Sequence, residues 1–220
     1  MPNFFTMTDN SYSYVYQARK EMLDFVPESC GKILEVGCGD GAFSVQLKER
    51  VGTEIWGIEM HAESAVIASR NLDKVICGNF LELLESKKLP ESYFDCVVFN
   101  DVLEHFPDYD YILSQIKRLL VPEGYVVTSL PNFRYVGNLW EIIIKKDFQY
   151  KSSGILDYTH YRFFTKKSIS RMYADSGYTV MKSYGINPTK SLKVKLLNVF
   201  TFNYFSDIPY IQIATLAQLK

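Results

Sequence analysis

The order of apolar and amphipathic segments restricts this 220-residue chain to one class of fold. In its first 130 residues, short apolar runs alternate with segments whose apolar residues recur every three or four positions. Such alternation is typical of parallel strands connected by helices. We therefore predict an α/β fold with a mostly parallel sheet of seven strands, helices on both faces and the last strand antiparallel. The length fits one domain over residues 1–220.

Two long segments, 132–165 and 185–209, interrupt this order near the end of the chain. We call them the first and second excursions, and we expect them to form the acceptor side of a ligand site, because long loops in an α/β sheet are unusual unless functional. Residues 1–30 should form an N-terminal helical cover. The strands are expected at Lys32–Val36, Glu54–Glu59, Lys74–Cys77, Phe94–Asn100, Tyr125–Leu130, Tyr178–Tyr184 and Tyr210–Leu216. The helices are expected at Tyr14–Phe25, Ala42–Arg50, Ala62–Asn71, Tyr109–Leu120 and Lys166–Ser176.

The formal net charge of −1 conceals a division of the chain into two parts. Residues 1–131 contain 11 Lys and Arg against 20 Asp and Glu, whereas residues 132–220 contain 13 against 5. The acidic part suits a cationic ligand, and the basic part suits an anionic one. The composition, 47% hydrophobic and 22% charged, excludes a disordered chain.

Several classes of protein are excluded by what the sequence lacks. The four cysteines, two of which fall in expected buried strands, have neither CxxC spacing nor nearby histidines, so we predict no metal site. The first residues have no signal-peptide pattern, and no apolar window is long enough to cross a bilayer. We therefore expect a cytoplasmic protein.

The segment ILEVGCGDGAF, Ile33–Phe43, predicts a strand, a glycine-rich turn and a helix. Glycines at 37, 39 and 41 allow a tight turn and present backbone amides to a ligand at a helix N-terminus. Glu59 ends the next strand, where a carboxylate can accept hydrogen bonds from both ribose hydroxyls of an adenosine. This geometry serves NAD and S-adenosylmethionine equally, so the loop alone leaves both open.

Further motifs give the sequence a family resemblance. The glycine loop, Glu59, GNF at Gly78–Phe80, FNDVLEHF at Phe99–Phe106 and LLVPEGYVVTSLPN at Leu119–Asn132 together resemble the class I S-adenosylmethionine-dependent methyltransferases over residues 31–185. The resemblance implies a Rossmann-like sheet, an enzyme and S-adenosylmethionine as cofactor. GILDYTHYRFFTKKS, residues 154–168, resembles a segment of bacterial methyltransferases associated with polysaccharide biosynthesis, which implies a sugar or glycan hydroxyl as methyl acceptor.

The resemblance also implies which residues bind the cofactor. Glu35 and the amides of Gly37, Gly39 and Gly41 should hold the methionine part and shape the loop, and Glu59 should bind the ribose.

The remaining implied contacts come from four other segments. Asn79 stands where the family usually has Asp at the adenine amino group, and Phe80 should pack against the adenine. Asn100 and Asp101 should lie near the sulfonium and the methionine amine. Tyr14 and Arg19 are candidates to close over the cofactor, Arg19 by pairing with its carboxylate.

A hydroxyl acceptor is helped by a base, and the candidates are His160 first and His105 second. Asp157 is placed in sequence to orient His160, and Arg162 to bind an anionic part of the acceptor. The alternative is a structural Asp–His–Arg cluster that holds the first excursion on the core. Several such enzymes need no base at all.

The acceptor side is basic and apolar. Four lysines and no acid lie between residues 176 and 206, and apolar residues are interleaved among them. This suits a small-molecule or glycan acceptor, with or without a phosphate group, whereas nucleic acid is not expected. Residues 190–206 would equally suit an anionic membrane surface, the protein's own core or a homodimer interface.

Two other functions compete with methyl transfer. The first is a NAD-dependent oxidoreductase, which is disfavoured because Glu35 precedes the loop and no hydride-transfer pair follows. The second is a non-catalytic cofactor-binding protein that acts through its basic C-terminal part.

Overall fold

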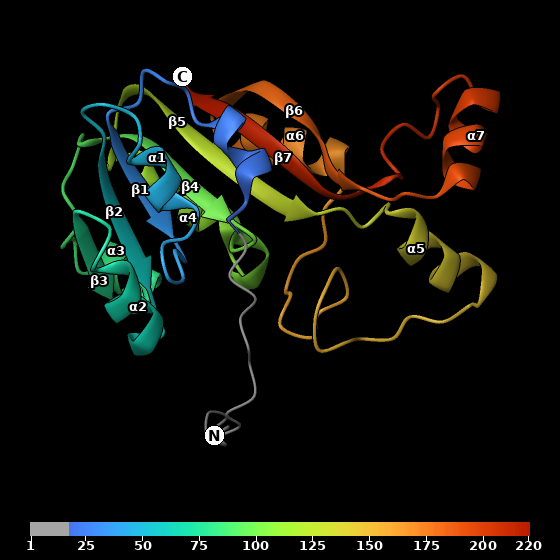
Figure 1. The fold of residues 1–220 in the computed structure, drawn as a ribbon, viewed down its shortest axis with the longest axis horizontal. Coiled ribbons are helices and arrows are strands. Elements are labelled where there is room, and N and C mark those ends of the chain that lie inside the picture. Colours follow the sequence, from blue (N-terminus) through green and yellow to red (C-terminus); the bar gives the residue numbers. More distant parts are fainter. Residues whose placement is uncertain (1–17) are drawn as a thin grey trace.

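A twisted seven-stranded sheet forms the centre of the molecule (Figure 1). The computed structural model describes residues 18–220, so Tyr14 lies outside the described residues. The strand order is β3-β2-β1-β4-β5-β7-β6, in which β7 runs antiparallel to both β5 and β6 and the remaining pairs are parallel. This arrangement confirms the predicted fold class. The strands are β1 (Lys32–Val36), β2 (Glu54–Glu59), β3 (Lys74–Cys77), β4 (Phe94–Asn100), β5 (Leu120–Pro131), β6 (Tyr178–Pro188) and β7 (Tyr210–Leu219).

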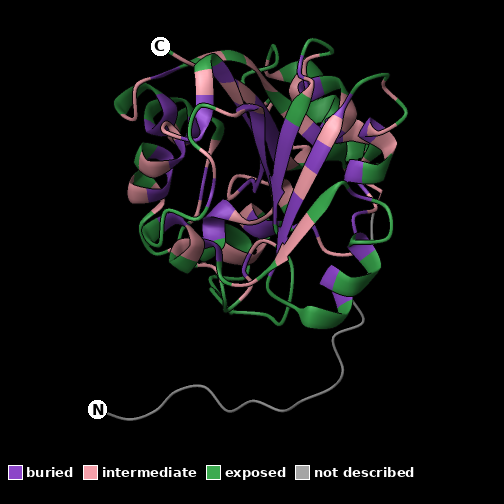
Figure 2. Cartoon of the chain, turned by 90° about the vertical axis from the view of Figure 1, so that its left-hand side faces the viewer, coloured by how far each residue is buried: buried purple, intermediate pink, exposed green. Residues whose placement is uncertain are grey.

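Helices cover both faces of the sheet, and each face has its own apolar core. Neighbouring strand residues point to opposite faces, so Ile33 packs in one core and Leu34 in the other. Figure 2 shows the buried residues along the strands and the exposed ones on outer helices and loops. The helices are η1 (Lys20–Phe25), α1 (Ser44–Leu47), α2 (Ala62–Ala68), α3 (Phe80–Glu85), η2 (Leu103–His105), α4 (Tyr109–Ile116), α5 (Val136–Leu139), η3 (Trp140–Ile144), α6 (Lys166–Asp175) and α7 (Leu192–Phe200).

Several boundaries differ from those predicted, because tertiary pairing competes with local pattern. Helix α4 ends at Ile116 instead of Leu120, since Leu120 pairs with Phe94 of β4 and so begins β5. Helix α3 was not predicted; its N-cap is Asn79, whose side chain accepts a hydrogen bond from the Leu81 amide. Cys77 is exposed instead of buried, because β3 is an edge strand.

Three helices also differ from expectation. Of the predicted Tyr14–Phe25 helix, the described part is a 3-10 helix that begins at Lys20. Helix α1 spans only Ser44–Leu47, within the predicted Ala42–Arg50. The second excursion contains the unpredicted helix α7, and β6 continues to Pro188 at its start.

The two excursions are joined to each other. The Arg134 guanidinium binds the Asp207 carboxylate through two contacts of 2.5 and 3.2 Å, and the Val136 amide donates to the Ile208 carbonyl. Helices α5 and α7 consequently project from the same end of the molecule, away from β3 (Figure 1). Within residues 18–220, no helix has the length and apolar character that a membrane span requires.

Candidate active site

The glycine loop follows β1 and turns sharply beneath Val102. Gly37, Gly39 and Gly41 have φ of 70°, 55° and 83°, a region that L side chains rarely adopt. A Cβ atom added at Gly37 would lie 2.6 Å from Cγ2 of Val102, so this position also needs the missing side chain for space. The loop therefore keeps its backbone close to the carboxyl ends of β1 and β4, where ligands of α/β sheets bind.

Glu59 at the end of β2 holds this loop in place. Its Oε2 accepts a hydrogen bond of 2.9 Å from the Gly39 amide, and its Oε1 accepts one of 2.8 Å from the His61 amide. A carboxylate has about four acceptor positions, so two remain. The predicted ribose contact therefore fits this position, and it stays a prediction.

Glu35 lies below the loop and is buried. Its two oxygens accept hydrogen bonds from the Ser44 hydroxyl at 2.6 Å and the Asn100 amide nitrogen at 3.1 Å. Burial raises the pKa of Glu35 to about 7. Glu35 thus connects the start of α1 to the end of β4 and shapes the loop from beneath, while its predicted contact with the methionine part stays a prediction.

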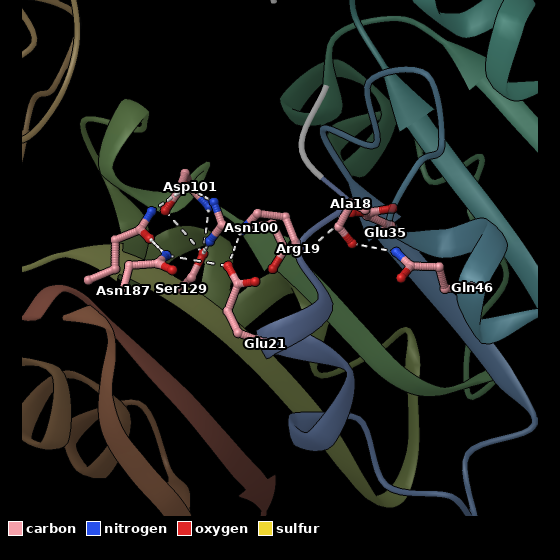
Figure 3. A network of polar contacts seen from close by, with 10 residues as sticks. Ala18, Arg19, Glu21, Glu35, Gln46, Asn100, Asp101, Ser129 and Asn187 are labelled. Carbon is pink, nitrogen blue, oxygen red and sulfur yellow. Dashed lines mark hydrogen bonds and ion pairs between the residues drawn. The ribbon is translucent and has the colours of Figure 1, made fainter. Parts of the chain in front are cut away.

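Arg19 and Asp101 form the most connected polar group at the carboxyl end of β4 (Figure 3). The Arg19 guanidinium pairs with the Asp101 carboxylate and donates to the Ser129 hydroxyl at 2.6 Å. Ser129 and the Gln212 amide also donate to Asp101, at 3.0 and 2.6 Å. Opposite charges side by side are complementary to an amino-acid group, which is the chemistry expected of the methionine end. Ser129 and Gln212 have no motif of their own, and only the strand order β4-β5-β7 brings them here.

The fit of S-adenosylmethionine to these residues rests on their chemistry. A glycine turn, an acidic strand end and a carboxylate–guanidinium pair lie at the carboxyl ends of the neighbouring strands β2, β1 and β4. Such groups suit the adenosine and amino-acid parts of that molecule. In addition, Oδ1 of Asn100 is buried without a hydrogen-bond partner among residues 18–220, so an acceptor is available beside Glu35.

The adenine end differs from what the resemblance implies. Oδ1 of Asn79 caps α3, and its predicted contact with the adenine amino group would have to share that oxygen. Phe80 is 5% exposed and packs edge-on against Phe99, with Phe106 beside it. As the first residue of amphipathic α3 it points into the core, so this position offers little ring surface for adenine.

Two of the three histidines meet beyond β4, next to a buried carboxyl group. The rings of His105 and His160 are 4.7 Å apart, and His160 Nε2 is 3.9 Å from Oε1 of the fully buried Glu104. Burial and the neighbouring Asp101 raise the pKa of Glu104 well above its usual value. Burial, with a smaller effect of His160, lowers the pKa of His105. We call Glu104, His105 and His160 the histidine cluster.

The proposed partner of His160 was wrong in detail. Asp157 accepts hydrogen bonds from the amide and hydroxyl of Thr159, and that hydroxyl contacts Nδ1 of His105. His160 instead contacts the Ile155 carbonyl and Glu104. The sequence does not single out Glu104, although it directly precedes His105, because a single Glu gives no sign of burial. Arg162 is exposed, and its predicted contact with an anionic acceptor stays a prediction.

The fold is similar to that of solved structures described as S-adenosylmethionine-dependent methyltransferases. One from Archaeoglobus fulgidus is 20% identical, with 87% of each chain covered and a TM-score of 0.63. Another, from Mesorhizobium loti, is 17% identical over 90% of this chain and 95% of its own, with a TM-score of 0.60.

The family follows from the sequence comparison. A family model described as a methyltransferase domain matches residues 12–183, and the chain therefore belongs to this family of S-adenosylmethionine-dependent enzymes, as the resemblance implied.

Several relatives have names that refer to quinone biosynthesis. A ubiquinone biosynthesis O-methyltransferase of Psychrobacter arcticus is 28% identical over 71% of this chain and 62% of its own length, so this chain spans under two thirds of it. A protein of the same name from Shewanella sp. is 25% identical over 86% and 80%. A demethylmenaquinone methyltransferase of Listeria welshimeri is 25% identical over 74% and 77%.

Proposed function

We propose that the chain transfers a methyl group from S-adenosylmethionine to a hydroxyl oxygen of a small-molecule acceptor. The observation that carries this proposal is the position of the histidine cluster. Glu104 and His105 follow Asp101 by three and four residues, and His160 contacts both of them, so groups that activate a hydroxyl lie near the Arg19–Asp101 pair of the predicted cofactor site. The names of the relatives support an oxygen acceptor on a small molecule.

The chemistry needs an acceptor oxygen in line with the carbon–sulfur bond. The sulfonium supplies the methyl group, the oxygen–carbon bond forms, and the electron pair of the broken carbon–sulfur bond stays on sulfur. The hydroxyl proton must leave, and His160 is our first candidate to take it, with His105 second. Glu104 at 3.9 Å would stabilise an imidazolium on His160.

The surface of the two excursions indicates the kind of acceptor. Large apolar side chains are exposed on both, and exposed lysines stand among those of 190–206. We infer an amphipathic acceptor with an apolar and an anionic part, and the sugar or glycan hydroxyl implied by residues 154–168 is one such acceptor. The exposed apolar and aromatic residues are Trp140, Ile143, Ile144, Phe148, Tyr150, Tyr158, Tyr161, Leu192, Leu196, Leu197, Val199, Phe200, Phe202 and Tyr204.

The first experiment measures binding and turnover separately. Calorimetry with S-adenosylmethionine, its demethylated product and NAD should give binding of the first two only, because both carry the amino-acid group that the Arg19–Asp101 pair suits and NAD does not. Binding of NAD without a response to the sulfonium would contradict the proposal and favour an oxidoreductase. Screening nucleotide-sugars, lipid-linked sugars and phenolic quinone precursors should then give one product heavier by one methyl group. A protein that binds the cofactor but methylates none of these would favour a non-catalytic role.

His160→Ala tests the activating group. We expect turnover to fall about 100-fold or more while the affinity for S-adenosylmethionine is unchanged, since His160 belongs to the acceptor side. His61→Ala is the matched control, because His61 is the third histidine of the chain and lies at the start of α2. Equal turnover in the two variants would remove His160 from the reaction.

A further inference from the structure

The carboxyl group of Glu104 is buried and lacks hydrogen-bond donors within residues 18–220. Its side chain is 0% exposed, and neither oxygen has a hydrogen-bond partner among residues 18–220. The contact of 3.9 Å with His160 Nε2 is too long for a hydrogen bond. A buried carboxylate without a hydrogen bond or a cation is costly to the fold. Something that this structure does not contain is therefore expected to meet these oxygens.

Hydrogen bonds set the orientation of both histidines in the cluster. Nδ1 of His160 lies 3.1 Å from the Ile155 carbonyl oxygen, which can only accept, so Nδ1 carries the proton. The Thr159 hydroxyl donates its proton to Asp157 at 2.7 Å and therefore accepts from Nδ1 of His105 at 3.1 Å. Each neutral imidazole is thus left with a lone pair on Nε2.

The cluster consequently brings together hydrogen-bond acceptors without a donor. One ligand atom from each of Glu104, His105 and His160 lies within 4.8 Å of the others. Two imidazole nitrogens and one carboxylate oxygen are the ligands that divalent first-row transition metals prefer, whereas Mg²⁺ and Ca²⁺ prefer oxygen alone. A backbone carbonyl and a Thr–Asp pair behind the rings are the kind of support that orients metal-binding histidines.

We propose that Glu104, His105 and His160 bind one divalent first-row transition-metal ion of the Zn²⁺ or Fe²⁺ type. Ligand atoms around a tetrahedral ion at about 2.1 Å stand roughly 3.4 Å apart, so binding would bring Glu104 and His160 about 0.5 Å closer than their present 3.9 Å, and no pair would have to close by more than about 1.4 Å. His105 is exposed, so an ion can reach the cluster from solvent. Three protein ligands leave coordination positions open, as in catalytic sites.

The use of the ion in catalysis rests on the proposed function. An acceptor hydroxyl in an open position would lose its proton to water more readily than a free hydroxyl, because the cation stabilises the alkoxide. The alkoxide oxygen then forms the bond to the methyl carbon, and the carbon–sulfur pair stays on sulfur. The ion would thereby replace the imidazole as the activating group.

The site can be tested without substrate or cofactor. Protein freed of metal and of any histidine tag is titrated with Co²⁺, followed by its visible absorption, and Zn²⁺ is added in competition. We expect one equivalent of Co²⁺ in the wild type and in His61→Ala, and loss of the absorption in Glu104→Gln and His160→Ala. Thr159→Val, which removes only the support behind His105, should weaken binding about 10- to 100-fold.

Two outcomes would overturn the inference. One is the absence of a Co²⁺ spectrum in the wild type, and the other is equal affinity in Glu104→Gln, His160→Ala and the wild type. Circular dichroism verifies that each variant folds. Calorimetry with S-adenosylmethionine on the metal-free wild type separates the two ideas. Cofactor binding without a metal site would end the metal inference alone, and a metal site without cofactor binding would end the proposed function alone.

Discussion

At the scale of single residues, Glu35 makes the stability of the fold depend on pH. Burial raises its pKa from 4.5 to about 7, so the folded chain retains a proton that the unfolded chain releases between these values. The contribution of protonated Glu35 is fully present below about pH 4.5 and is lost as pH rises through about 7. The loss amounts to about 3 kcal/mol, the free energy that corresponds to a pKa raised from 4.5 to about 7.

Glu35→Gln tests this dependence. The side chain of the variant cannot ionise. Its free energy of unfolding should therefore rise relative to that of the wild type by up to about 3 kcal/mol as the pH increases from about 5 to about 8. The Asn100 amide can turn over to donate or accept, because its Oδ1 has no other partner within residues 18–220. Urea unfolding at the two pH values measures the difference, with exposed Glu49→Gln as control. A difference that is independent of pH would show that Glu35 ionises normally.

Glu59 should decide cofactor affinity. Glu59→Ala removes the carboxylate that faces the loop and the predicted ribose site, so binding of S-adenosylmethionine should weaken by about 2–4 kcal/mol, as for one or two charge-assisted hydrogen bonds. Calorimetry measures the change, and Glu63→Ala, on the exposed side of α2, is the control. Equal affinity in both variants would place the ribose elsewhere.

At the scale of elements, the Arg134–Asp207 pair fastens the two excursions together. Arg134→Gln should release them, because this bidentate contact connects segments 73 residues apart. The loss of stability should be about 1 kcal/mol or less, since the pair is partly exposed. Hydrogen exchange should nevertheless rise in 145–165 and 190–206, and the KM for the acceptor should rise while cofactor affinity is kept.

The control for this prediction is another ion pair of the same region. Lys145→Gln breaks the exposed contact with Glu141, which lies within one segment. If exchange rises equally in both variants, or in neither, the two excursions do not depend on Arg134 for their position.

At the scale of the whole molecule, the division of charge corresponds to two regions of the fold. The acidic part builds β1 to β5 with their loops, and the basic part builds the excursions, α6, β6 and β7. Helix α7 buries only Val194, while Leu192, Val199 and Phe200 are more than two-thirds exposed beside the lysines. We propose that residues 190–206 contact an anionic lipid surface, from which an amphipathic acceptor would be taken.

Vesicle binding tests this surface. The wild type should sediment with vesicles that contain anionic lipid, and less so at high salt, because each lysine near the surface contributes about 1 kcal/mol that salt screens. Changing Lys190, Lys193 and Lys195 to Glu should abolish binding, whereas Lys87→Glu with Lys88→Glu, elsewhere on the surface, should not. Sedimentation of the wild type independent of lipid charge, or a stable dimer in size-exclusion chromatography, would contradict the proposal.

The fold and the glycine loop could be predicted from the sequence because their signals are local. Neighbouring residues alone are enough to identify an apolar strand such as Phe94–Asn100 or a glycine turn such as the one at 37–41. The short helices α3 and α7 were not predicted, because each has too few residues to show a clear helical repeat of apolar positions.

What the sequence alone determined about this protein is therefore its α/β class with a mostly parallel seven-stranded sheet, its glycine loop and the acidic residues at the strand ends. Only the tertiary structure decided which side chains meet. Ser129 and Gln212 reach Asp101 from strands far along the chain, and His160 finds Glu104 instead of its neighbour Asp157. The physical reason is that burial and long-range contacts set the charge and partners of Glu35 and Glu104, and neither is encoded in local spacing.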